Sequence, residues 1–150
     1  MKLSIQAVTK ENYQEILKLR VAVSQSDYIE TPMECLTEAT ECEFYKPVGL
    51  YYDDQLVGFA MYGYFPDETK KGRLWIDRIL IDSHYQGKGL GTLFMEALID
   101  KVEEEFGAQP IFLSVYPDNE GAIHMYDKLG FVFNNEFDIN GESIMVRDLS

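Results

Sequence analysis

Three glycines at alternate positions, Gly87, Gly89 and Gly91, separate an apolar run from a helix-like segment in the stretch "DSHYQGKGLGTLF". Backbone N–H groups at the start of a helix have no partner within the helix, and the helix dipole there favours negative charge. Glycines let a ligand approach the backbone closely because they carry no Cβ atom. A strand, a glycine-rich turn and a helix in this order therefore predict a site for a phosphate or pyrophosphate group.

The spacing of these glycines argues against two common nucleotide-binding loops. A P-loop requires Lys and then Ser or Thr directly after its last glycine, but Lys88 comes too early. A Rossmann fingerprint requires a third glycine where Thr92 stands, and it belongs to a parallel βαβ unit. A tight turn without a ligand is the remaining alternative, and the neighbouring Gln86 and Lys88 favour a binding loop over it.

One carboxylate, that of Asp77, interrupts the apolar run "LWIDRILI" that precedes the loop. A charged group in a buried strand is costly unless it is paired or faces a cleft. Arg78 is the next residue, but neighbouring residues of a strand point to opposite faces, so we expect the two side chains not to pair. Asp77 is therefore a candidate for chemistry in a cleft.

Residues 26–43 carry six acidic side chains and no lysine or arginine. Glu34, Glu38 and Glu41 follow helical spacing, so we expect them to share one face of a helix. The negative charges on such a face repel one another unless a cation binds there. The alternative is a solvated helix face with acidic residues near the helix start.

The charge of the whole chain bounds the class of partner. The 150 residues include 26 acidic and 13 basic side chains, which gives a formal net charge of −13. This balance excludes nucleic acid as the expected partner, because phosphate backbones select Lys- and Arg-rich surfaces. A negative field would attract a cationic ligand, although a need for solubility alone also explains the negative net charge.

Composition also indicates the compartment. No run approaches the roughly 20 apolar residues that a membrane helix needs, and the N-terminus turns polar too soon for a signal peptide. Cys35 and Cys42 lie on a predicted helix, about two turns apart, which is too far for a disulfide. We therefore expect a reduced, cytoplasmic protein that does not bind membranes.

The apolar pattern predicts the elements that must position these residues. The first half reads as a strand at 3–8, helices at 9–23 and 31–45, and a hairpin at 46–65, with Thr9 and Thr31 as N-caps and Asp53–Asp54 as the hairpin turn. The buried strand 72–82 precedes the glycine loop. A helix at 90–107 then follows, with a strand at 110–116, a helix at 119–130 and a hairpin at 131–149 that turns at Asn140–Gly141. We expect residues 1–150 to form one α+β domain with one large sheet.

The pattern Gln86-x-x-Gly89-x-Gly91 on such a turn resembles the acyl-CoA motif of the GNAT family of N-acetyltransferases. The later stretch "NEGAIHMYDKLGF" resembles the second signature of that family, with one helix and one strand between the two motifs. The resemblance implies the GNAT fold, which is α+β and α/β/α sandwich-like. Its mixed, mostly antiparallel sheet has about seven strands, with about four helices.

The resemblance implies acetyl-CoA as co-substrate and no metal. Main-chain N–H groups of residues 86–91 would hold the pyrophosphate, and the strand before them would pair with the pantetheine arm. Asn119 would bond the pantetheine or orient the next turn, whereas Lys88 and Lys128 would lie near the phosphates or simply be solvated. The expected cofactor-binding residues are Ile79, Leu80, Ile81, Gln86, Gly87, Lys88, Gly89, Leu90, Gly91, Asn119 and Lys128.

Acetyl transfer to an amine requires a neutral amine, a polarised thioester and a protonated leaving thiolate. With a pKa of about 10.4, only about one alkylamine in a thousand is neutral at pH 7, so a positioned base helps. The resemblance makes Tyr126 the acid that protonates the thiolate and Asp77 the base, acting directly or through water. The alternatives are a core aromatic for Tyr126 and an ion pair for Asp77. We interpret His84 and His124 as surface residues.

Within this family, the whole chain resembles the bacterial spermine/spermidine (diamine) acetyltransferases. That resemblance and the acidic segment both favour a linear polyamine or diamine as acceptor. We predict Tyr28, Glu30 and Glu34 at the acceptor site, with Tyr52 and Tyr62 as its walls. The alternatives are an aminoglycoside, a small amine or a peptide amine as acceptor, and a CoA-binding regulator without turnover. The final strand, "SIMVRDL", is a candidate homodimer contact.

Overall fold

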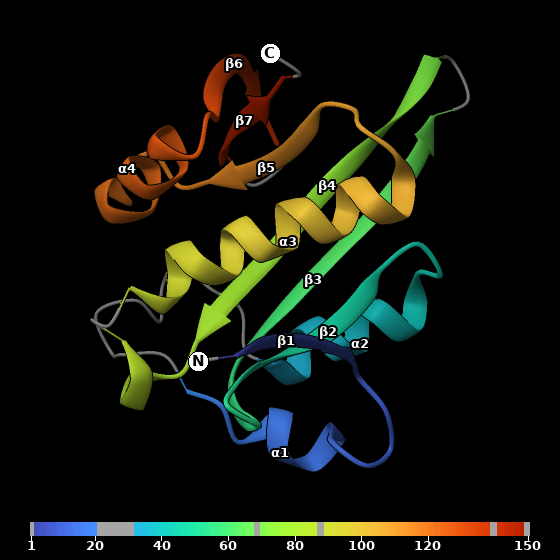
Figure 1. Cartoon of the computed structure of the whole chain (residues 1–150). Helices are drawn as coiled ribbons and strands as arrows, with labels where there is room; N and C mark the ends of the chain where they lie inside the picture. Colours follow the sequence, from blue (N-terminus) through green and yellow to red (C-terminus); the bar gives the residue numbers. More distant parts are fainter. Residues whose placement is uncertain (1, 21–31, 68–69, 87–88, 139–140, 149–150) are drawn as a thin grey trace.

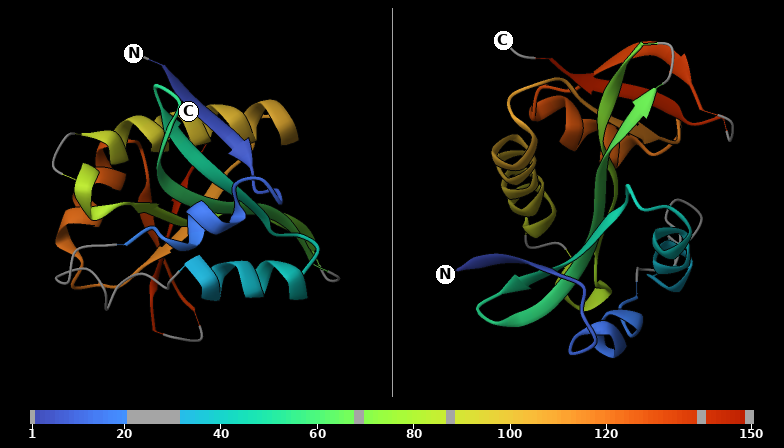
Figure 2. Two further views of the ribbon diagram at one scale, coloured as in Figure 1. Left: turned by 90° about the horizontal axis from the view of Figure 1, so that it is seen from below. Right: turned by 90° about the vertical axis from the view of Figure 1, so that its right-hand side faces the viewer.

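The domain is built on a seven-stranded sheet with the strand order β1-β2-β3-β4-β5-β7-β6. This computed structural model describes residues 2–20, 32–67, 70–86, 89–138 and 141–148. β4 and β5 pair in parallel, and the other neighbouring strands pair antiparallel. Figure 2 shows α3 and α4 on one face of the sheet and α1 and α2 on the other. The predicted α+β sandwich with a mixed, mostly antiparallel sheet is confirmed.

The element bounds follow the predicted order. The strands are β1 (Leu3–Ala7), β2 (Lys46–Tyr52), β3 (Gln55–Asp67), β4 (Lys70–Ile81), β5 (Ile111–Val115), β6 (Val132–Phe137) and β7 (Ser143–Arg147). The α-helices in the described part of the chain are α1 (Tyr13–Leu17), α2 (Pro32–Glu41), α3 (Leu90–Phe106) and α4 (Glu120–Lys128). None of the described helices is long and apolar enough to cross a membrane.

The first helix starts later than predicted. α1 begins at Tyr13, so the prediction of Thr9 as its N-cap is wrong. The Thr9 hydroxyl accepts a hydrogen bond from the Glu11 N–H at 3.2 Å, and the Asn12 side chain accepts one from the Thr9 N–H at 2.8 Å. These local bonds offer the backbone an alternative to a helical turn. The predicted N-cap Thr31 lies outside the described residues.

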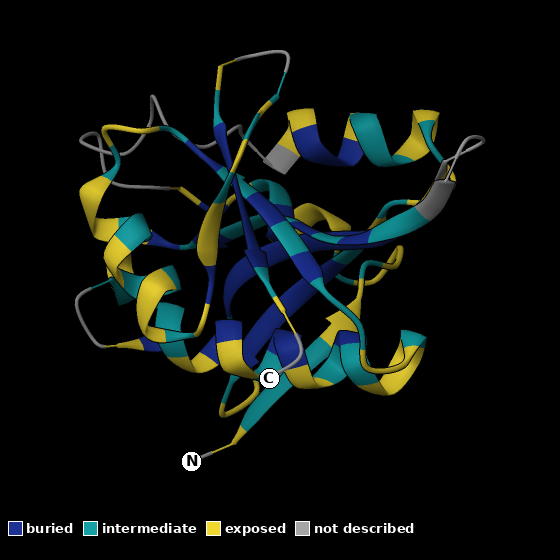
Figure 3. Cartoon of the chain, turned by 90° about the horizontal axis from the view of Figure 1, so that it is seen from above, coloured by how far each residue is buried: buried dark blue, intermediate teal, exposed yellow. Residues whose placement is uncertain are grey.

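Two apolar cores lie on opposite faces of the sheet. The inner face of α3 packs on the sheet through Leu90, Phe94, Met95, Leu98, Ile99 and Val102. On the other face, Ile16 of α1 and Leu36 of α2 pack against Phe59, Met61 and Leu80. Figure 3 shows the buried residues along the centre of the sheet. Cys35 is buried in the second core, and it and Cys42 are both free thiols, as expected.

The sheet opens between β4 and β5, as Figure 1 shows. The ladder joins them at only two described positions, Leu74–Ile111 and Trp75–Phe112. β4 then continues to Ile81 and β5 to Val115 without further pairing in the described ladder. The edge of β4 beyond Trp75 therefore faces an opening in the sheet, and a backbone edge of this kind can pair with an extended ligand.

Candidate active site

The glycine loop ends in a left-handed residue at the start of α3. Gly89 is the N-cap of this helix and has φ +76° and ψ 7°. This conformation strains any residue with a Cβ atom, which explains the glycine. The backbone N–H groups in the first turn of α3 are thus available to an anion. The predicted Gly87 and Lys88 lie outside the described residues, and Leu90 and Gly91 form the first turn.

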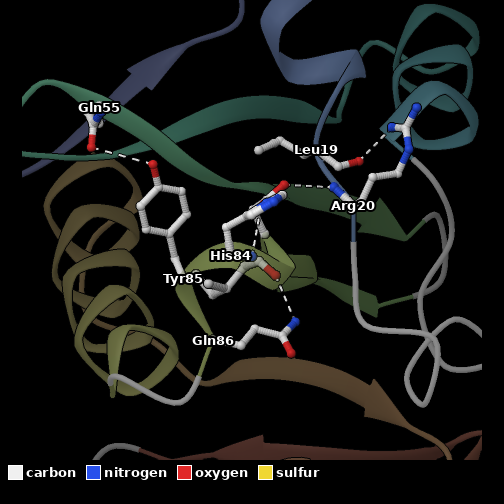
Figure 4. A network of polar contacts seen from close by, with 8 residues as sticks. Leu19, Arg20, Gln55, His84, Tyr85 and Gln86 are labelled. Carbon is white, nitrogen blue, oxygen red and sulfur yellow. Dashed lines mark hydrogen bonds and ion pairs between the residues drawn. The ribbon is translucent and has the colours of Figure 1, made fainter.

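A buried carboxylate anchors the segment that leads into this loop. Asp82 accepts hydrogen bonds from the Arg20 N–H at 2.9 Å and the His84 N–H at 2.9 Å. Its burial raises its pKa, but these backbone bonds and the contact with the His84 ring lower it more, so the net pKa falls. The Gln86 side chain donates to the Ile81 carbonyl at 2.9 Å, as Figure 4 shows. Sequence reasoning missed this anchor, which links the end of α1 to the loop.

The strand before the loop divides its predicted cofactor residues between the two faces. Ile79 and Ile81 pack against the α3 core, whereas Leu80 is buried in the core under α1 and α2. If Leu80 takes part in cofactor binding, it therefore does so through its backbone and not through its side chain. Asn119 is the N-cap of α4, and its side chain accepts from the Ala122 N–H at 3.4 Å, so it orients the next turn. Lys128 is exposed in the last turn of α4.

Tyr126 lies on α4 and packs against Phe131, with ring centroids 5.9 Å apart. Burial and the negative charge of Glu142 raise the pKa of Tyr126 to about 12. A phenol in this state remains protonated throughout the physiological pH range, so it can donate a proton but not accept one. The side chain is therefore both a packed aromatic residue and a candidate acid.

Asp77 and Arg78 form an ion pair, so the expectation that they point apart is wrong. The Arg78 Nη1 atom lies 2.9 Å from the Asp77 Oδ2 atom. The cause is a β-bulge: Tyr62 pairs with Ile76 and Met61 pairs with Arg78, which leaves Asp77 as an extra residue in β4. The extra residue breaks the alternation of faces, and both side chains lie on the α2 side of the sheet.

Two further residues hold this pair from the α2 side. Glu38 of α2 accepts from Arg78 Nη2 at 3.2 Å, so one acidic residue of the predicted helix face reaches the sheet. The Tyr45 hydroxyl hydrogen-bonds Asp77, and burial and the Asp77 charge raise the pKa of Tyr45 well above its usual range. Arg78 thus joins a carboxylate of the sheet to one of the helix.

The turn between β6 and β7 brings two more carboxyl groups to this region. The Glu142 N–H donates to Asp138 Oδ1 at 2.9 Å. Burial and the adjacent Asp138 raise the pKa of Glu142 to about 7, and Asp77 raises it further whereas Arg78 lowers it. Glu38, Asp77, Arg78, Asp138 and Glu142 are called the acidic cluster below.

The predicted acceptor residues are only partly placed. Tyr28 and Glu30 lie outside the described residues, and Glu34 is exposed on α2, one turn before Glu38. Tyr62 is buried in the core on the α3 side and half-buried Tyr52 packs against the same core, so their role as walls of the acceptor site stays a prediction. The Tyr62 hydroxyl donates to Glu105 of α3 at 2.7 Å. His84 and His124 are exposed, as predicted.

The geometry combines a helix start whose N–H groups can receive an anion, an opening between β4 and β5, and a half-buried tyrosine on α4. The model of the acetyltransferase (GNAT) family matches residues 12–131. The chain belongs to the GNAT family. This result confirms the predicted family and, with it, the predicted class of acetyl-CoA-dependent acetyltransferase.

Known GNAT proteins resemble the chain over nearly its full length. It is 49% identical over 152 aligned residues to the spermine/spermidine N(1)-acetyltransferase of Bacillus subtilis (strain 168), covering 99% of this chain and 100% of the relative. It is 50% identical, with the same coverage, to a probable spermine N(1)-acetyltransferase of Bacillus subtilis subsp. natto (strain BEST195). The crystal structure of the aminoglycoside acetyltransferase AAC(6')-Ib with coenzyme A matches with a TM-score of 0.80 at 20% identity, over 98% of this chain and 95% of the other, and confirms the GNAT fold.

Sequence reasoning missed several residues of this candidate site. The roles of Arg78, Tyr45 and Asp138 depend on the bulge and on contacts between distant segments, for which no local pattern exists. Glu142 had a partial signal, because the predicted hairpin turn at Asn140–Gly141 places residues 138 and 142 opposite one another.

Proposed function

We propose that this protein transfers the acetyl group of acetyl-CoA to a primary amine of a linear polyamine, such as spermidine or spermine. The acidic cluster carries the proposal, because Arg78 pairs with Glu38 and Asp77, and the Asp138–Glu142 pair adds two more carboxyl groups that interact with this site through Glu142. A polyamine bears several positive charges along a flexible chain, and such a site would neutralise them. The two relatives named for spermine or spermidine acetylation support the same acceptor.

The two sides of the sheet have different tasks in this proposal. On the α3 side, N–H groups of residues 86–91 hold the pyrophosphate, and Lys88 and Lys128 lie near the phosphates. The edge of β4 at residues 79–81 pairs with the pantetheine arm. On the α2 side, Asp77 faces the amine, and Tyr28, Glu30 and Glu34 bind the rest of the polyamine.

The residues of the chain act on the reacting atoms in one sequence. The amine enters from the α2 side and loses a proton, and its lone pair attacks the thioester carbonyl carbon. Tyr126 then donates its phenolic proton to the departing thiolate. Its phenolate recovers a proton from the nitrogen of the intermediate, which restores the tyrosine and leaves an amide.

A panel of amines tests the proposal. Purified protein is incubated with acetyl-CoA and spermidine, spermine, a diamine, an aminoglycoside or an N-terminal peptide, and free thiol is measured. We expect turnover with spermidine and spermine, with mass spectrometry showing one added acetyl group. Preference for the aminoglycoside or the peptide would contradict the polyamine assignment. Binding of CoA without turnover on any amine would indicate a regulator instead.

The homodimer remains a prediction, but its expected contact moves from the final strand to its neighbour. β7, which contains most of "SIMVRDL", lies between β5 and β6, so both of its edges are already paired. The outer strand is β6, whose Val132, Phe133 and Phe137 are exposed. A dimer contact at this end of the sheet would therefore involve β6, and light scattering of the purified protein would test it.

A further inference from the structure

The Asp138–Glu142 pair has so far been given a role in attracting the polyamine but none in the proton transfers. Two ionised carboxylates repel each other and offer no proton for a hydrogen bond between them. The Asp138 carboxylate accepts a hydrogen bond from the Glu142 N–H at 2.9 Å, and its proximity raises the pKa of Glu142, so the pair favours a state that carries one proton. The turn that holds them is fixed by the Asp138 N–H to Glu142 carbonyl bond at 2.9 Å and the Gly141 N–H to Asp138 carbonyl bond at 3.1 Å. The two carboxyl groups can thus hold one proton between them.

Glu142 lies at the opening between β4 and β5. The next residue, Ser143, pairs with Val115 at the end of β5, the strand that diverges from β4. Met145 points into the α3 core, so alternation places Glu142 on the α2 side, where the amine enters. The groups that interact with it electrostatically are Asp138 from its own turn, Asp77 and Arg78 from β4, and Tyr126 from α4.

Asp77 is less suited to accept the proton of the amine. Arg78 lies 2.9 Å from its carboxylate, and the Tyr45 hydroxyl hydrogen-bonds it. Both contacts stabilise the charged form of a carboxylate. A carboxylate stabilised in its charged form can bind a cation. A general base, however, must also take up and release a proton in every cycle.

We infer that Glu142 accepts the proton of the substrate ammonium, and that Asp77 positions the amine. This inference rests on the proposed acetyl transfer. The N–H bond of the ammonium breaks, its proton forms an O–H bond on Glu142, and the neutral amine keeps the electron pair that then attacks the thioester. After the product leaves, Glu142 releases the proton to water, so each turnover adds one proton to the solution.

The environment of Glu142 suits this role. An ordinary glutamate lies about 6 pH units below an alkylammonium in pKa, which makes the transfer steeply uphill. With its pKa near 7, Glu142 reduces that gap to about 3 pH units. The transfer also acts on Tyr126: its pKa is raised in part by the Glu142 charge, so a protonated Glu142 makes the phenol a stronger acid just before the thiolate leaves.

The pH dependence of three variants tests this assignment. We expect Glu142→Gln to lower kcat for spermidine by about a hundredfold at pH 7, because general bases contribute about 10²–10⁴-fold. The acidic limb of kcat/KM near pH 7 should disappear, and Glu142→Asp should restore part of it. Asp77→Asn should instead raise KM and retain the limb. Asp148→Asn, an exposed carboxylate after β7, is the matched control and should behave as wild type.

A less basic amine gives a readout that a merely structural role would not change. A fluorinated primary alkylamine with a pKa below 8 is largely neutral without help, so it does not need the base. The deficit of Glu142→Gln should shrink at least tenfold with this amine. An equal deficit with both amines, or a wild-type limb in Glu142→Gln, would overturn the assignment. Acetyl-CoA binding by calorimetry checks that the variant is folded.

Failure of this inference is distinct from failure of the proposed function. If wild-type protein does not acetylate spermidine or spermine, the polyamine proposal fails. If the wild type acetylates them and Glu142→Gln keeps both its rate and its pH profile, only the role of Glu142 fails.

Discussion

Asp77 and Arg78 are consecutive residues of β4, yet their side chains meet at 2.9 Å on the same face of the sheet. The β-bulge at Asp77 produces this arrangement, and Glu38 of α2 completes it at 3.2 Å from Arg78. Bulges are frequent beside active sites because they redirect a side chain without ending the strand. Here the bulge brings a carboxylate and its partner to the side from which the amine is proposed to enter.

Arg78→Lys should destabilise the domain. Arg78 contacts Asp77 and Glu38 through two different nitrogens, whereas a lysine carries its N–H groups on one nitrogen and cannot span both positions, so one carboxylate loses its partner. We expect a loss of about 2 kcal/mol in the free energy of unfolding and a Tm lower by about 4–8 °C. Thermal denaturation measures it. Arg147→Lys, which changes the more exposed pair with Glu103, is the control and should cost less than about 1 kcal/mol. Equal losses in the two variants would show that the pairs of Arg78 contribute no more to stability than an exposed ion pair.

Tyr126→Phe should remove the proton for the thiolate and keep the packing against Phe131. We expect kcat to fall about a hundredfold while acetyl-CoA affinity changes little, because the phenyl ring still fills the site. Steady-state kinetics with spermidine and calorimetry with CoA separate the two effects. Tyr13→Phe, on the exposed tyrosine of α1, is the control. An unchanged kcat in Tyr126→Phe would exclude it as the acid.

Gly89→Ala should weaken CoA binding through the backbone. The residue has φ +76°, where a Cβ atom costs about 1–2 kcal/mol, so the helix start would shift. We expect roughly a tenfold loss of CoA affinity, because about 1.4 kcal/mol corresponds to tenfold. Gly107→Ala is a matched control: its φ is +86°, and neither glycine has an atom within 4 Å of an added Cβ. It should lower Tm and leave CoA affinity unchanged. A normal affinity in Gly89→Ala would count against the loop as the pyrophosphate site.

The stability of the protein should fall as the pH rises through the range set by Glu142. Its pKa is raised from 4.5 to about 7 in the folded state, so the folded protein binds the extra proton between these values. Its contribution is present below pH 4.5 and is lost as the pH rises through 7. Glu142→Gln should therefore raise Tm at pH 8 but not at pH 4.5, as measured by scanning calorimetry at both values. A gain of the same size at pH 4.5 would mean that the charge is not the cause.

Glu34→Lys should weaken binding of the acceptor. Glu34 is exposed on α2, one turn from Glu38, and a positive charge there would repel a polyamine. One pair of charges near 4 Å in water is worth about 1 kcal/mol, so we expect KM for spermidine to rise about fivefold and kcat to stay. Glu104→Lys makes the same charge change on the far end of α3 and should have no effect. If both variants raise KM alike, the effect reflects net charge and not a site.

The sequence predicted the frame of the site better than its polar contacts. Element order, the hairpin turn at Asp53–Asp54 and the glycine at the start of α3 all follow from local backbone preferences, and they were correct. The Asp77–Arg78 pair was predicted wrongly because alternation holds only in a regular ladder, and the bulge depends on how β3 pairs with β4. No local pattern predicts the bond from the Tyr62 hydroxyl to Glu105 either, because it joins β3 to a helix 43 residues later in the chain.

The bulge in β4 divides this strand into two halves that are out of phase. Before Asp77, the residues on the α3 side are Leu74 and Ile76; after it, they are Ile79 and Ile81. A strand shortened by this single residue would turn Ile79 and Ile81 toward α2 and Leu80 toward α3, which exchanges their cores. The length of β4 is therefore under a stricter constraint than the identity of most of its residues, and variants that insert or delete one residue here should be much rarer than substitutions.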